Sequence, residues 1–217
     1  MASTIIHIAV ADQLYHKLKS KIDIHYNDYI LGSIAPDISK IVGDTKEISH
    51  FLEKVEGIPN IDKFLKKYIN TLNNSFNLGY FIHLYTDRLF YRDYYPLFVK
   101  DDFFNSTVKC LDGHTIKISK EDKRKLLYND YSNLNIKLID EYNLNLDLFY
   151  KEFIPPKTNI EEIPTDKLNL LIDAAGIILQ NLKQEKEYII DITSIKSFID
   201  DCVEEIYIKL ISLGLIK

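Results

Sequence analysis

The sequence has no tryptophan and only two cysteines, Cys110 and Cys202, among its 217 residues. Two cysteines are too few for the disulfide framework of a small secreted protein. Glycine (7) and proline (6) are also scarce, which leaves room for long helices. No stretch approaches the roughly 18 uninterrupted apolar residues of a membrane-spanning helix, and no basic segment followed by an apolar run marks a signal peptide. We therefore expect a cytoplasmic protein.

An excess of positive charge is missing as well. The chain carries 27 basic and 32 acidic residues, which gives a formal net charge of −5. Proteins that bind long nucleic acids or anionic membranes by electrostatics alone rely on excess positive charge. We therefore expect no long nucleic acid as a partner. Hydrophobic residues (46 %) and charged residues (27 %) are present in the proportions of a globular chain, and the length fits a single domain over residues 1–217.

Apolar residues recur with helical spacing along most of the chain. In residues 120–143, for example, Leu127, Tyr131 and Leu134 share one face, and Ser119 is placed to cap the first turn. The pattern predicts helices over residues 5–20, 61–74, 76–95, 120–143, 166–183 and 194–213.

One segment alternates with a period of two instead. Its two runs flank Asp112-Gly113, and Asp-Gly between alternating runs predicts a β-hairpin, here near residues 107–118. Residues 22–60 contain several glycines and prolines, so we expect loops there. The sequence therefore predicts an all-α fold, a multi-helix bundle of about six helices with one small β-hairpin.

His83 and Asp87 are the most informative of the residues that carry chemistry. They stand four residues apart in a predicted helix, so both side chains lie on one face and can hold one metal ion. The alternative is a buried histidine beside a surface aspartate that pairs with Arg88 or Arg92. Gly79, one turn earlier, favours the metal site, because glycine costs a helix about 1 kcal/mol and allows another segment to approach closely.

Further candidate ligands precede this helix. His7 lies on the apolar face of its predicted helix, Asp37 ends an apolar segment, and His50 stands at the edge of a loop, whereas His16 falls on the opposite face from His7. Three imidazoles and two carboxylates suit zinc or another first-row divalent metal. Five ligands exceed the needs of one tetrahedral ion with an open position. Two ions that share a carboxylate are therefore the economical arrangement, and a single ion is the alternative.

Four blocks of the first 95 residues follow one another in a recognisable order. They are Ser3-Thr4-Ile5-Ile6-His7, Leu31-Gly32-Ser33-Ile34-Ala35-Pro36-Asp37, Ser49-His50-Phe51 and Leu78-Gly79-Tyr80-Phe81-Ile82-His83-Leu84-Tyr85-Thr86-Asp87. In order and spacing they resemble the blocks of the zinc-dependent phospholipase C family, which is related to the S1/P1-type nucleases. The resemblance implies a mainly helical metallohydrolase that cleaves phosphodiesters, with His7, Asp37, His50, His83 and Asp87 as metal ligands and Asp87 as the bridge between two ions.

The chain also departs from the family. Members with three metal ions carry another histidine ten residues after the one that corresponds to His83, and later a His-x-x-x-Glu motif. In this chain the first position is Asp93. The only later histidine is His114, and the residue four positions after it is Ile118, not a glutamate. We therefore expect the third metal site to be absent or rebuilt. Asp93 and Asp130 are the candidates for an additional metal or substrate contact, and the alternative is that both are solvated acids on helix surfaces.

The activity predicted from these features is phosphodiester hydrolysis of the phospholipase C type by a metal-activated water, with Asp37 as the catalytic residue that orients the water or takes its proton. We expect a phospholipid or a small phosphodiester as substrate. The apolar segments 94–99 and 103–104 closely follow the helix that carries His83 and Asp87, and they suit acyl chains or transient contact with a membrane interface. They suit a stacked nucleobase equally well, and the alternative is ordinary core beneath a long loop. Two alternatives stay open: a nuclease or nucleotide-directed hydrolase on the same scaffold, and a non-enzymatic metal-binding or interaction protein.

Overall fold

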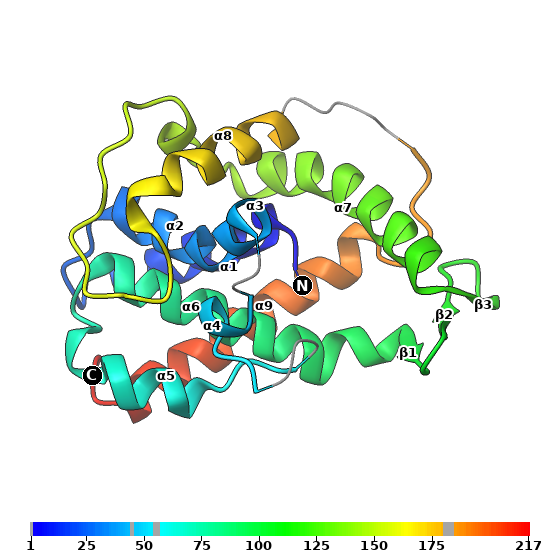
Figure 1. Ribbon diagram of the computed structural model, residues 1–217, viewed down its shortest axis with the longest axis horizontal. Helices are drawn as coiled ribbons and strands as arrows, with labels where there is room; N and C mark the ends of the chain where they lie inside the picture. Colours follow the sequence, from blue (N-terminus) through cyan, green and yellow to red (C-terminus); the bar gives the residue numbers. More distant parts are fainter. Residues whose placement is uncertain (1, 44–45, 54–56, 180–184) are drawn as a thin grey trace.

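The computed structural model describes residues 2–43, 46–53, 57–179 and 185–217. The fold is predominantly helical with one small antiparallel sheet, as the sequence predicted (Figure 1). The helices are α1 (Thr4–Leu18), α2 (Tyr26–Ile34), α3 (Ser39–Val42), α4 (Lys46–Ser49), α5 (Ile61–Tyr68), α6 (Ser75–Leu89), α7 (Lys120–Tyr142), α8 (Leu168–Leu179) and α9 (Ile192–Ser212), and the strands are β1 (Val99–Asp101), β2 (Asn105–Lys109) and β3 (Thr115–Ser119).

Helices α2 and α6 cross at two glycines. A side chain at Gly79 of α6 would collide with the carbonyl oxygen of Tyr29, and one at Gly32 of α2 would collide with the carbonyl oxygen of Phe76. The two backbones are therefore in direct contact, as the sequence predicted for Gly79. The prediction of loops over residues 22–60 was wrong at α2, because Gly32 serves this contact and does not end the helix.

The predicted helices are all present, although two of them end early. Helix α5 passes into a 3₁₀ turn at Ile69–Thr71, and α6 passes into a π turn at Phe90–Tyr94. Ser119 caps α7 as expected, since its hydroxyl accepts a hydrogen bond from the backbone N–H of Asp122. The predicted helix over residues 166–183 begins with a 3₁₀ turn and continues as α8, and its last residues, 180–183, lie outside the described part.

The predicted hairpin corresponds to β2 and β3, in which Thr107 pairs with Lys117. A third strand, β1, extends it: Lys100 pairs with Thr107, so the sheet order is β1-β2-β3. This strand has only three residues, too few for a visible alternation in the sequence. The sheet lies at one edge of the molecule, beyond the end of α6 and beside the start of α7 (Figure 1).

The buried apolar side chains form one continuous cluster that reaches from α1 to α9. Helix α6 runs through it: apart from Ser75 and Arg88, every residue of this helix is buried. A helix so enclosed can carry polar residues only where other polar groups meet them. None of the described helices combines the length and the apolar run that crossing a bilayer would require.

Candidate metal centre

The polar side chains that α6 buries meet those of three other segments. His83 and Asp87 lie on α6, His7 lies on α1, Asp37 lies in the 3₁₀ turn Ala35–Ile38, and His50 directly follows α4. None of these five residues is more than 1 % exposed. Their ligand atoms form two groups, each with its atoms within 4.8 Å of one another: His7, His83 and Asp87, and Asp37, His50 and His83. The structure thus brings together all five residues proposed from the sequence.

The Asp87 carboxylate lies between the histidines. Its Oδ1 is 3.4 Å from His7 Nε2, and its Oδ2 is 3.8 Å from His50 Nε2 and 3.9 Å from His83 Nε2. Oδ1 also lies 3.3 Å from the backbone nitrogen of Ala2. The two oxygens of this carboxylate therefore face different histidines.

Asp37 joins the centre to a basic side chain. Its Oδ1 lies 3.4 Å from His50 Nε2, whereas its Oδ2 accepts a hydrogen bond from the Lys40 amine at 2.6 Å. Lys40 is itself 38 % exposed while the carboxylate is buried, so the lysine reaches the centre from the surface. Sequence reasoning missed this contact, although the spacing of three residues on consecutive helical turns was a usable signal.

Groups outside the centre orient the histidine rings. His83 Nδ1 lies 2.8 Å from the carbonyl oxygen of Ser33, to which it donates a hydrogen bond, so its Nε2 directs a lone pair into the centre. This contact depends on the α2–α6 crossing, because Ser33 follows Gly32. His50 Nδ1 lies 2.9 Å from the Ser49 hydroxyl. The ring of His7 stacks on that of His83 with centroids 3.8 Å apart.

The protonation states suit metal ligands. Burial lowers the pKa of His83 well below its usual value, and the nearby His7 lowers it further, so the ring is neutral. Burial alone would raise the pKa of the Asp37 and Asp87 carboxyls. Lys40 beside Asp37, and His7 beside Asp87, more than offset burial and hold both pKa values below their usual range. Neutral imidazoles and ionised carboxylates are the forms that bind metal.

Several buried nitrogen and oxygen atoms of the centre lack a hydrogen-bond partner among the described residues, which bears on whether a metal fits here. Among the described residues, both ring nitrogens of His7 and Oδ1 of Asp37 are buried without a hydrogen-bond partner. Each such atom costs about 1–3 kcal/mol. The Nε2 atoms of His50 and His83 also approach to 3.2 Å. Nitrogen and oxygen acceptors in excess of donors form a donor set that zinc prefers, so the residues present fit a metal.

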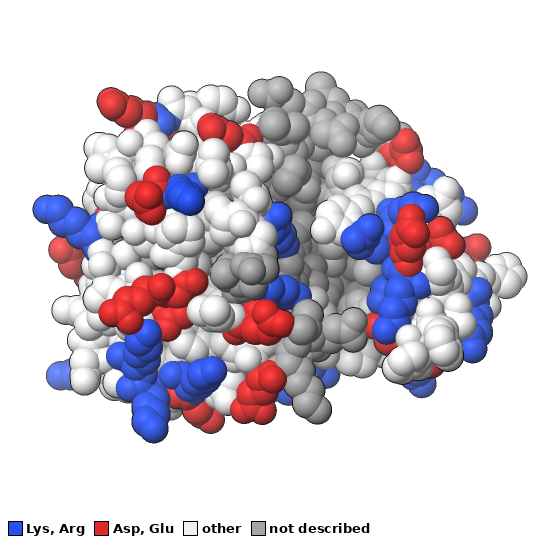
Figure 2. Space-filling view, in the orientation of Figure 1, with Lys and Arg blue, Asp and Glu red and all other residues white. Residues whose placement is uncertain are grey.

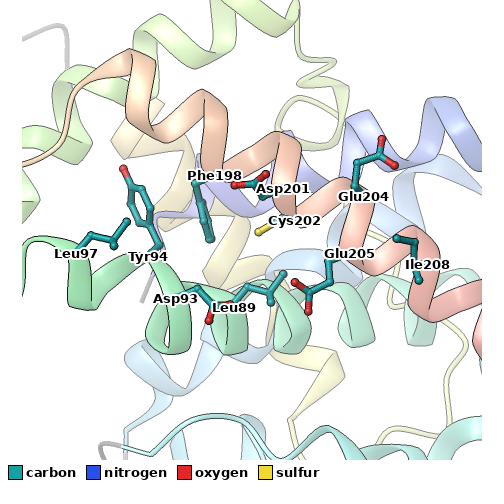
Figure 3. A pocket seen from close by; sticks show the side chains of 10 residues that line it. All are labelled: Leu89, Asp93, Tyr94, Leu97, Phe198, Asp201, Cys202, Glu204, Glu205 and Ile208. Atoms are coloured by element: carbon teal, nitrogen blue, oxygen red, sulfur yellow. The ribbon is translucent and has the colours of Figure 1, made fainter.

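The two further carboxylates proposed from the sequence lie elsewhere. Asp93 is on the π turn, where it pairs with Arg92 at 2.6 Å and lines a groove of about 420 Å³ between the end of α6 and α9 (Figure 3). None of the five residues of the centre lines this groove. Asp130 is buried in α7, and its carboxylate accepts hydrogen bonds from three consecutive backbone N–H groups, those of residues 188–190. Asp130 thus anchors the segment before α9.

A comparison with known protein families covers the segment that contains the centre. Residues 6–90 match the family model described as zinc dependent phospholipase C, and this segment contains all five residues. No curated protein and no solved structure matches the chain at a significant level. The match supports a zinc-dependent hydrolase. The resemblance predicted from the four sequence blocks is therefore confirmed for residues 6–90: this segment matches the zinc-dependent phospholipase C family.

Proposed function

We propose that the chain is a metal-dependent hydrolase of the phospholipase C type, which cleaves a phospholipid or a small phosphodiester. The observation that carries this proposal is the convergence of three imidazoles and two carboxylates, all buried, around polar atoms that lack a hydrogen-bond partner among the described residues. The family match over residues 6–90 supports the same reaction.

The donor geometry favours two zinc ions with Asp87 between them. Asp87 belongs to one of the two groups of candidate ligands, and its second oxygen faces His50 of the other group. Other first-row divalent metals suit the same donors. Bound there, the ions would supply Lewis-acid chemistry, which activates water and screens the charge of a phosphoryl group.

Asp37 is the proposed catalytic residue. The Lys40 amine holds one of its oxygens, and the other faces His50 with no hydrogen-bond donor from the part of the chain that the structure describes. Because Lys40 keeps the pKa of this carboxyl low, we propose that Asp37 accepts a hydrogen bond from the attacking water and orients it, and does not store its proton. Pairing with Asp37 outweighs burial and raises the pKa of the Lys40 amine, so a fixed positive charge stands beside the position of an anionic phosphodiester.

Turnover by the zinc-loaded chain tests the proposal. The substrates are a soluble chromogenic phosphodiester, phosphatidylcholine and single-stranded DNA. We expect hydrolysis of the first two, its loss in Asp87→Ala, and full activity in His16→Ala, because His16 is 55 % exposed and lies outside the centre. Hydrolysis of DNA alone would assign the centre to a nuclease. No hydrolysis of any of the three by fully loaded protein would contradict an enzymatic role.

A further inference from the structure

The turn between β1 and β2 presents two adjacent phenylalanines to solvent. Phe103 is 84 % exposed and Phe104 is 76 % exposed. Their rings contact each other edge to face with centroids 4.8 Å apart. Single exposed apolar residues are normal on protein surfaces, but two neighbouring aromatic rings that pack mainly on each other form a compact apolar tip. We call Phe103 and Phe104 the aromatic tip.

The backbone holds the aromatic tip in one conformation. Oδ1 of Asp102 accepts hydrogen bonds from the backbone N–H groups of Phe104 at 2.9 Å and of Asn105 at 2.6 Å. The neighbouring Asp101 is fixed in turn by the Lys123 amine at 2.8 Å and the Tyr95 hydroxyl at 2.9 Å. The rings are therefore exposed by an ordered turn, and their exposure is a property of the fold.

Lysines surround the aromatic tip. Lys117 pairs with Asp102 at 3.0 Å and Lys123 pairs with Asp101, so both acids are neutralised. Two further lysines stand near the β1–β2 turn: Lys100 lies on β1, and Lys120 begins α7 directly after Ser119, the residue of β3 that pairs with Asn105. Among the described residues, neither of these two has an acidic partner. In Figure 2, Lys and Arg side chains lie among Asp and Glu side chains on this part of the surface, which a hollow separates from the body of the molecule.

We propose that the aromatic tip contacts the surface of an anionic phospholipid bilayer, with the rings at the interface and the lysines against lipid phosphates. Two phenylalanine rings offer roughly 300–500 Å² of surface, whereas a stable protein interface needs about 800 Å² per partner. A small convex tip with excess positive charge matches a bilayer, which offers an apolar interior beneath a negative surface. The inference rests on the proposed function, in which a phospholipid is the substrate, and names where the lipid surface is met.

The absence of tryptophan allows a direct test. Phe104→Trp gives the full chain a single tryptophan, whose emission we expect to shift to the blue with vesicles of phosphatidylcholine and phosphatidylserine. Tyr150→Trp is the matched control, because Tyr150 is 79 % exposed on a segment far along the chain, between α7 and α8. The same shift in both variants, or in neither, would overturn the proposal.

Sedimentation with the same vesicles tests the natural residues. We expect Phe103→Ser/Phe104→Ser to weaken binding by about tenfold or more, and Lys100→Glu/Lys120→Glu to abolish the preference over pure phosphatidylcholine. Unchanged binding by the serine variant, no binding by the natural chain, or self-association that depends on the two rings would each overturn the proposal. Hydrolysis of a soluble phosphodiester, measured in parallel, should be unaffected. Its absence in all proteins would refute the proposed function while leaving vesicle binding interpretable.

Discussion

Two helices of this protein carry a histidine and an aspartate one turn apart, and only one pair lies in the metal centre. On α6, His83 and Asp87 are fully buried and meet three more ligands. On α1, Asp12 lies 3.5 Å from His16, which is 55 % exposed. The Tyr26 hydroxyl donates to Asp12 at 2.6 Å, so that carboxylate already has a strong partner. The spacing of four residues along a helix is therefore not enough to predict a metal site. The side chains that pack against that face of the helix decide whether further candidate ligands are within reach.

The largest difference between the two pairs is expected in zinc content, when one residue of each pair is replaced by alanine. Asp87→Ala deletes the carboxylate whose oxygens face several histidines. We expect it to remove most of the bound zinc, because the group of His7 and His83 loses its only carboxylate and His50 of the other group loses a neighbouring oxygen. His16→Ala should bind as much zinc as the natural chain. Elemental analysis of proteins purified in parallel measures both. Equal zinc loss in the two variants would contradict the distinction between the two pairs.

The glycine contact provides a second test, because it places α2 against the metal centre. Gly79→Ala forces a methyl group onto the Tyr29 carbonyl, and we expect it to lower the free energy of unfolding by about 3 kcal/mol and to weaken zinc binding. Gly176→Ala in α8 is the matched control, since no atom in the described part of the chain lies within 4 Å of the added carbon. It should stabilise the protein by up to about 1 kcal/mol. Urea unfolding measures the free energy of unfolding of both variants. Similar destabilisation by the two substitutions would show that the α2–α6 crossing has no special role.

Lys40 should matter more in the metal-free protein than in the loaded one. Lys40→Met leaves the buried Asp37 charge unpaired, and we expect the free energy of unfolding of the metal-free protein to fall by about 1–2 kcal/mol. Zinc should offset this loss, because a cation then meets the carboxylate. As a control, Lys125→Met removes an exposed ion pair to Glu121 and should change stability by less than about 0.5 kcal/mol. A loss that zinc leaves unchanged would show that Asp37 is not a ligand.

The smallest effect is expected outside the centre. Asp93→Asn changes a surface carboxylate that pairs with Arg92, so zinc content and phosphodiester turnover should match those of the natural chain. Elemental analysis and a turnover assay measure this. Loss of one equivalent of zinc would show that Asp93 holds a further ion, despite its position on the groove beside α9.

Sequence reasoning reached the helices α1 and α5 to α9 and the five polar residues because their signals are local or carried by short blocks. It missed α2 because Gly32 is a helix breaker by propensity, and its role depends on a second helix far along the chain. The carbonyl of Ser33, which orients His83, has no side-chain signature at all. The short β1 and the π turn after Leu89 depend on packing around them and leave no periodic pattern.

The central claim is that the histidines and carboxylates of the first ninety residues hold zinc. X-ray absorption at the zinc edge of the purified full chain tests it directly. We predict about one to two equivalents of zinc with nitrogen and oxygen neighbours near 2.0–2.1 Å, including imidazole. The two cysteines are free, Cys202 being buried and Cys110 partly exposed. Sulfur neighbours near 2.3 Å, or a protein that retains no zinc, would contradict the claim.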